Sequence, residues 1–66
     1  MQITLNGAPR ELPAPLTVAG LLDRLELAGR RVAVEVNEEL VPRSQHPGRL
    51  LEEGDRVEVV QAIGGG

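Results

Sequence analysis

The chain has 66 residues, no Cys, no aromatic residues and a formal net charge of −3 at pH 7. This length predicts one domain with one small core, and the absence of Cys excludes disulfides and thiolate metal sites. All of its cations are Arg, so no lysine amine can form an isopeptide or a Schiff base, and the acidic balance argues against a nucleic-acid-binding protein.

The N-terminal residues predict a β-hairpin. Ile3 and Leu5 alternate with polar residues, as in a strand with one buried face. Asn6-Gly7 comes next, a pair that tolerates the positive φ angles of a tight hairpin turn. Because Pro13 has no N–H to donate to a neighbouring strand, we expect the second strand to be short and to lie at the edge of its sheet.

Residues 16–29 predict an amphipathic helix, because their apolar positions recur with the spacing i, i+3, i+4 and i+7. The members of this apolar stripe are Val18, Leu21, Leu22 and Leu25. We expect Thr17 to be the N-cap, and Gly29 to be the C′ residue that ends the helix in the left-handed conformation. Such a helix covers one face of a sheet.

The second half of the chain returns to the alternation of β-strands. Residues 32–36 predict a strand with its valines on one face, a turn follows at Asn37-Glu38, and residues 40–41 predict a short strand. Residues 43–55 are expected to be mostly loop, and the last strand is expected over residues 56–63. The loop side chains that we expect to tuck under the core are Leu50 and Leu51.

This order of elements predicts a two-layer α+β domain in which one helix lies on one face of a single sheet. We expect the domain to comprise residues 1–63. Residues 64–66 are all Gly, so we expect them to form a flexible tail, since glycine is the residue least restricted in its backbone angles.

The body of the chain offers no clear catalytic or metal-binding group. Ser44 and His46 are expected to lie in a solvated loop, because nucleophilic catalysis needs a third group to orient the base. Arg43 is expected to form a surface ion pair with a neighbouring acid. The acids that lack the spacing of a calcium loop, and are expected to form a solvated turn, are Glu52, Glu53 and Asp55. We therefore expect neither an enzyme nor a bound metal or cofactor.

One reactive group remains, the α-carboxylate of Gly66. Linking a carboxylate to AMP creates a leaving group that a sulfur or nitrogen nucleophile can displace, inside an enzyme site that excludes water. Gly64 and Gly65 have no Cβ atoms, so they can thread a narrow channel into such a site. An extended glycine tail would place the carboxylate about 10 Å beyond Ile63. The globular domain would then be the handle that partner enzymes recognise.

Four segments together resemble the ThiS family of ubiquitin-related sulfur carriers. They are "MQITLNG" at the start, "LTVAGLLDRL" in the helix, "VAVEVNEELVPRSQ" after it and "LEEGDRVEVVQAIGGG" at the end. The resemblance covers essentially the whole chain. It implies a ubiquitin-like β-grasp fold, with a mixed sheet of four to five strands in which the first strand lies beside the last.

The resemblance also implies a function in the formation of the thiamine thiazole. Gly66 would be adenylated by a ThiF-like adenylyltransferase that uses ATP and magnesium, then converted to a thiocarboxylate with sulfur from a cysteine desulfurase. The sulfur would pass to thiazole synthase, ThiG. Because the sequence has no long apolar run and no leader, we expect a cytoplasmic protein with no membrane partner.

Three alternative functions stay open at this point. The small subunit of molybdopterin synthase shares the fold and the Gly-Gly end, a ubiquitin-like modifier would form isopeptides with lysines of other proteins, and a plain binding module would not use its tail. Val60 and Ala62 alternate with the core-facing valines of the last strand. They are expected either to present an apolar partner surface or to pack under a loop.

Overall fold

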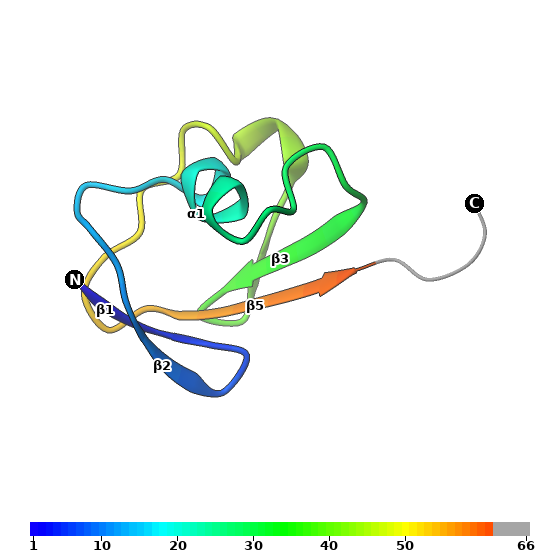
Figure 1. Cartoon of the computed structure of the whole chain (residues 1–66). Helices are drawn as coiled ribbons and strands as arrows, with labels where there is room; N and C mark the ends of the chain where they lie inside the picture. Colours follow the sequence, from blue (N-terminus) through cyan, green and yellow to red (C-terminus); the bar gives the residue numbers. More distant parts are fainter. Residues whose placement is uncertain (62–66) are drawn as a thin grey trace.

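The computed structural model describes residues 1–61 of the chain as one sheet with a helix on one face (Figure 1). The elements are β1 (Gln2–Leu5), β2 (Ala8–Glu11), α1 (Val18–Arg24), β3 (Val32–Val36), β4 (Glu39–Val41), the 3₁₀ turn η1 (Arg43–Gln45) and β5 (Arg56–Gln61). The five strands lie in the order β2-β1-β5-β3-β4. The predicted boundary at Ile63 and the predicted glycine tail lie outside the described residues.

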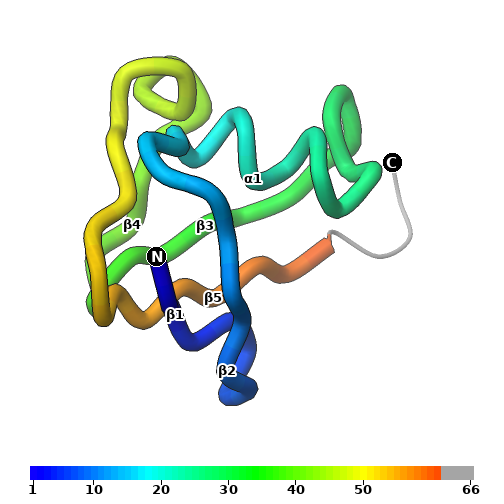
Figure 2. The backbone as a smooth tube through the Cα atoms, turned by 60° about the vertical axis from the view of Figure 1, so that its left-hand side comes forward, coloured from blue at the N-terminus to red at the C-terminus, as the bar shows by residue number. Residues whose placement is uncertain are grey.

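The sheet is mixed, because β1 pairs with β5 in parallel and every other pairing is antiparallel. The first strand therefore lies beside the last, in the middle of the sheet, as the predicted β-grasp arrangement requires. Figure 2 shows α1 lying across one face of these strands. Within residues 1–61, no helix has the length and apolar character needed to cross a membrane.

The predicted N-terminal hairpin is confirmed. Asn6 and Gly7 have φ angles of 49° and 84°, the positive values that a two-residue hairpin turn needs. β2 pairs only with β1 and is exposed along its length, so it is the expected edge strand. Pro9 lies within this strand, where a missing N–H is tolerated because one side of the strand has no neighbour.

The start of α1 is as predicted, but its end is not. The side-chain oxygen of Thr17 accepts a hydrogen bond from the Gly20 amide at 3.0 Å, as an N-cap residue does. The helix ends at Arg24, and Glu26 rather than Gly29 takes the left-handed position, with a φ of 61°. The Leu27 amide then donates to the Leu22 carbonyl at 2.8 Å, the long bond of a Schellman motif.

The early end of the helix has a packing reason. Leu27, which follows the left-handed residue, is partly buried and packs against the hydrophobic core. If the helix continued toward Gly29, the Leu27 side chain would rotate away from the core-facing side of the helix, since successive residues turn by 100°. Gly29 is also in the left-handed region, with a φ of 79°, but it belongs to the next turn before β3.

The core lies between α1 and the sheet and is wholly aliphatic. Its fully buried side chains come from the stripe of α1 and from alternate positions of three strands: Ile3, Val18, Leu21, Val34, Val36 and Val57. Leu51 is also buried, as predicted, but Leu50 is 54% exposed. Leu50 forms an isolated β-bridge with Thr17, so the chain is extended there and the two adjacent leucines point to opposite sides.

Replacing Glu26 by Gly should stabilise the fold, because an L-residue in the left-handed region costs about 1 kcal/mol that glycine does not. Glu26→Ala is the matched control, since it also removes the carboxylate but keeps the Cβ atom. We expect Glu26→Gly to exceed Glu26→Ala by about 1 kcal/mol in the free energy of unfolding measured with urea. Equal stability of the two variants would contradict the left-handed assignment.

Candidate functional site

The predicted site, Gly66, follows β5 in the sequence. The hydrogen bonds of β5 with its neighbouring strands therefore fix the point from which the chain continues toward this site. On one side β5 pairs with β3 in antiparallel register from Val57 to Gln61. On the other side it pairs with β1 in parallel through Arg56 and Val57. β5 is thus a central strand, and Figure 1 shows its arrow pointing away from the end of the molecule that holds Met1.

Asn6 continues the β1 side of this pairing after β1 has ended. Its backbone amide donates to the Val57 carbonyl at 2.9 Å. Its side-chain Oδ1 accepts from the Val59 amide at 2.9 Å, and its Nδ2 donates to the Val59 carbonyl at 3.2 Å. The Asn6 side-chain amide therefore replaces a further residue of β1. It extends the hydrogen bonding on this edge of β5 from Val57 to Val59, two residues nearer the end of the strand.

A second asparagine holds the start of β5. The Oδ1 of Asn37 accepts from the Arg56 amide at 2.9 Å, and its Nδ2 donates to Asp55 Oδ1 at 3.0 Å. Asp55 Oδ2 in turn accepts from the Glu52 amide at 2.8 Å. The sequence predicts Asn6 and Asn37 only as turn residues. The signal for their second role is their position, since each directly follows a strand that borders β5.

Of the three acids that the sequence predicts to form a solvated turn, Glu52 and Glu53 are exposed, but Asp55 is not. Asp55 is buried and uses both carboxylate oxygens to join Asn37 and Glu52. Glu53 is exposed but accepts from the Gln2 amide at 3.0 Å, which ties this turn to β1. Among residues 1–61, no cluster of His, Asp or Glu side chains could hold a metal ion.

The loop with Ser44 and His46 also differs from its prediction in one respect. Ser44 is exposed, but His46 is buried, with Nε2 3.0 Å from the Val41 carbonyl oxygen. The His46 carbonyl accepts from the Ala19 amide at the start of α1. His46 therefore fixes the loop between β4 and the helix, and the predicted solvated loop is wrong for this residue.

The predicted tail residues Ala62, Gly64, Gly65 and Gly66 lie outside the residues that the structure describes. Val60 is described, and it is 62% exposed, whereas Val57 and Val59 are buried. The expected alternation along the last strand is therefore confirmed. Packing of Val60 under a loop is excluded by its exposure.

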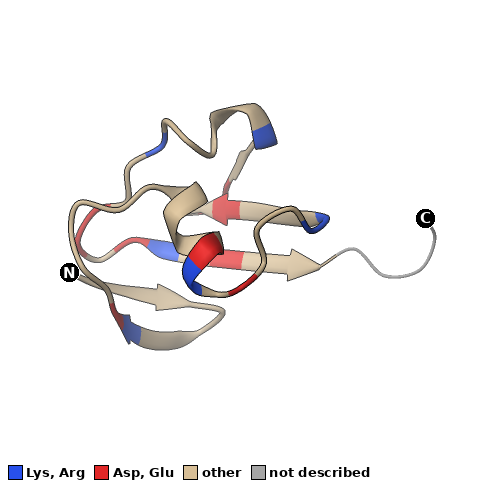
Figure 3. Ribbon diagram, turned by 45° about the horizontal axis from the view of Figure 1, so that its top comes forward, with Lys and Arg blue, Asp and Glu red and all other residues tan. Residues whose placement is uncertain are grey.

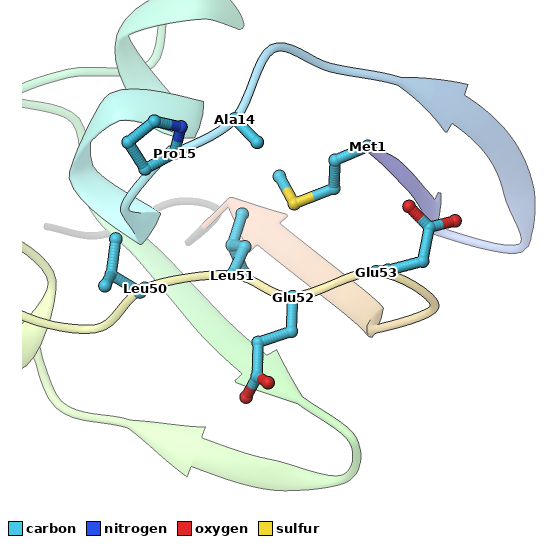
Figure 4. A pocket seen from close by; sticks show the side chains of 7 residues that line it. All are labelled: Met1, Ala14, Pro15, Leu50, Leu51, Glu52 and Glu53. Carbon is cyan, nitrogen blue, oxygen red and sulfur yellow. The ribbon is translucent and has the colours of Figure 1, made fainter.

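Two of the pockets formed by residues 1–61 lie at opposite ends of the molecule. The larger, of about 840 Å³, is lined by Met1, Ala14, Pro15, Leu50, Leu51, Glu52 and Glu53 (Figure 4). The smaller, of about 320 Å³, lies where β5 ends and is lined by Arg31, Val32, Ala33, Arg43, Val60 and Gln61. Only the smaller pocket adjoins the segment that leads to the predicted site. Arg43 lines this pocket, and its predicted ion pair with a neighbouring acid is wrong, since no acid of residues 1–61 lies within salt-bridge distance of it.

Comparisons with known proteins agree over the whole chain. The ThiS family pattern matches residues 3–66. The chain is 33% identical over 66 residues to the sulfur carrier protein ThiS of Escherichia coli (strain K12), covering all of both proteins. A crystal structure of the thiamine biosynthesis protein (ThiS) from Geobacter metallireducens is 35% identical, covers 100% of both chains and has a TM-score of 0.84.

A longer relative is similar to this chain over part of its length. The chain is 42% identical over its 66 residues to a thiazole synthase of Paramagnetospirillum magneticum. It spans 20% of that protein's length.

Replacing Asn6 by Gly should loosen the end of β5, because glycine keeps the positive φ of the turn but removes both side-chain bonds to Val59. We expect a loss of about 1–2 kcal/mol in the free energy of unfolding and faster hydrogen exchange of the Val59 amide. Asn6→Asp, which keeps an acceptor for that amide, should protect it better. Unchanged exchange in Asn6→Gly would show that the side chain does not hold the strand.

Proposed function

We propose that this chain, which belongs to the ThiS family, is a sulfur carrier protein of thiamine biosynthesis and carries sulfur on the α-carboxylate of Gly66. The observation that carries the proposal is the family match through residue 66, which includes the glycine tail as well as the folded body. The composition supports it, because a chain with no Cys has no thiol on which to hold a persulfide.

The proposed chemistry has two steps. The Gly66 carboxylate attacks the α-phosphate of ATP, so that an acyl-adenylate forms and pyrophosphate leaves. A hydrosulfide-level sulfur nucleophile then attacks the acyl carbon, the bond to AMP breaks, and the product is a thiocarboxylate. Adenylation is needed because AMP is a far better leaving group than the oxide of a free carboxylate.

The partner enzymes would supply the catalytic groups. We propose that a ThiF-like adenylyltransferase brings ATP and magnesium, that a cysteine desulfurase provides the sulfur as a persulfide, which a thiol reductant converts to the hydrosulfide level, and that all of this takes place in the cytoplasm. The chain itself would have no enzymatic activity. Gly64 and Gly65 would pass through the narrow channels of these enzymes, where a residue with a Cβ atom would be obstructed.

Thiazole synthase is the partner that we propose to receive the sulfur. The support is the similarity of this whole chain to one fifth of a protein named thiazole synthase. A carrier sequence within a synthase would bring the donor and the acceptor of sulfur together at high effective concentration.

Incubation with a ThiF-like adenylyltransferase, ATP, magnesium and sulfide should replace one oxygen of the chain by sulfur. We expect the intact mass to rise by the difference between a sulfur and an oxygen atom, and we expect no change when ATP is omitted. The E. coli carrier is the positive control for the enzyme. If that carrier gains sulfur and this chain does not, the proposed chemistry is wrong.

A chain whose Gly66 carboxylate is converted to an amide should fold normally but accept no sulfur. An amide cannot attack ATP, and residues 1–61 form their core and sheet without that group. Circular dichroism and thermal unfolding would check the fold, and the mass assay would check the reaction. Sulfur uptake by the amidated chain would place the reactive group elsewhere.

A further inference from the structure

The hairpin turn at Asn6-Gly7 contains the groups needed for a spontaneous change of its own covalent structure. An asparagine is thermolabile because the backbone amide nitrogen of the next residue can attack its side-chain amide carbon, Cγ. A glycine in the next position favours this attack, since it has no Cβ atom and its backbone angles are the least restricted. The chain has two asparagines, Asn6 and Asn37, and only Asn6 is followed by glycine.

The attacking nitrogen and the space around it are accessible. Asn6 and Gly7 are both exposed, and a Cβ atom built on Gly7 would meet no other atom within 4 Å. Within residues 1–61 the Gly7 amide donates no hydrogen bond. Figure 3 shows no charged residue in this turn between β1 and β2. Solvent can therefore reach the turn, and the Gly7 nitrogen is not held by another acceptor.

The fold holds the Asn6 side chain away from this reaction. Its Oδ1 accepts from the Val59 amide at 2.9 Å, and its Nδ2 donates to the Val59 carbonyl at 3.2 Å. Both polar atoms on Cγ are thus directed at the backbone of β5 and not at the Gly7 nitrogen. Asn6 must release Val59 before Cγ can turn toward that nitrogen. Such a release is a local opening, and its free energy includes the loss of these two hydrogen bonds.

We propose that Asn6 is a deamidation site and that its hydrogen bonds to Val59 control the rate. When these bonds open, the Gly7 nitrogen attacks Asn6 Cγ and gives up its proton, the Cγ–Nδ2 bond breaks, and ammonia leaves. The five-membered succinimide ring that remains then takes up one water. Attack of water on Cγ gives aspartate, whereas attack on the backbone carbonyl carbon gives isoaspartate. The reaction consumes water and releases ammonia, without an oxidant or a reductant.

Both products weaken the attachment of β5. Aspartate at position 6 keeps an acceptor for the Val59 amide, but it has no N–H for the Val59 carbonyl, which then faces a carboxylate oxygen. Isoaspartate lengthens the main chain of the turn by one carbon, so the turn no longer fits the register that pairs Leu5 with Ala8. Deamidation at one exposed turn therefore loosens the central strand of the sheet.

The test follows deamidation of the full chain during prolonged incubation in neutral buffer. Intact mass would detect the exchange of an NH₂ group for an OH group, and fragmentation would assign it to Asn6 or Asn37. A peptide of residues 1–12 is the reference, since it contains the same turn but lacks Val59, and an isolated hairpin is marginally stable. We expect Asn6 to deamidate at least about tenfold faster in the peptide than in the folded chain.

A variant of β5 tests the control by Val59 without altering the reacting residues. Val57→Ala removes buried methyl groups, so it should open the strand more often and accelerate both Val59 amide exchange and Asn6 deamidation by the same factor. Val60→Ala removes the same atoms from the exposed side of β5, and both rates should stay close to those of the unaltered chain.

The chemistry and the product have their own variants. Gly7→Asp keeps a residue that tolerates a positive φ but adds a Cβ atom, so deamidation of Asn6 should slow in the full chain. Asn6→Asp is the aspartate product itself. The Val59 amide should exchange faster in this variant than in the unaltered chain, and equally fast in purified chains that have deamidated to aspartate.

Two results would overturn the proposal. Equal rates at Asn6 in the peptide and in the folded chain would show that Val59 does not control the reaction. An unchanged Asn6 in both the peptide and Val57→Ala, after the same incubation, would show that this turn is not a deamidation site. The inference does not depend on sulfur transfer, so a failure of sulfur loading would leave it intact.

Discussion

The hydrogen bonding of β5 on both of its edges is the constraint on which the rest of the structure depends. β3 satisfies one edge, and β1 with the Asn6 side chain satisfies the other as far as Val59. The segment that we propose to carry sulfur thus follows, in the sequence, a strand that is hydrogen-bonded on both edges. A strand bonded on both edges is among the last parts of a domain to open in local unfolding.

The two faces of the sheet differ in their burial. The face under α1 holds the core valines and leucines and accounts for the stability of the domain. The opposite face contributes little to the core, and it places Glu35 opposite Glu58, a pairing of like charges that disfavours the folded state.

The sequence was sufficient for features that depend on local chemistry. Asn6-Gly7 specifies its turn, Thr17 specifies the helix start, and alternating valines specify which face of each strand is buried. The sequence was insufficient where a contact with a residue far away in the chain determines the local conformation or burial. Glu26 is left-handed because this conformation lets Leu27 pack against the core. Asp55 can be buried because Asn37, which lies in another turn, donates a hydrogen bond to its carboxylate. The exposure of Leu50 likewise follows from its bridge to Thr17. The chemistry proposed for Gly66 rests on composition and family resemblance, since no packing pattern marks a reactive chain end.

The most direct measurement of the central claim is the location of the sulfur within the carrier. The chain would be loaded by the activating enzyme and then fragmented intact in the mass spectrometer, so that the added mass can be assigned to a segment. The account predicts that every fragment containing Gly66 carries the added sulfur and that every fragment drawn from residues 1–61 lacks it. Added sulfur on a fragment from residues 1–61 would contradict the account.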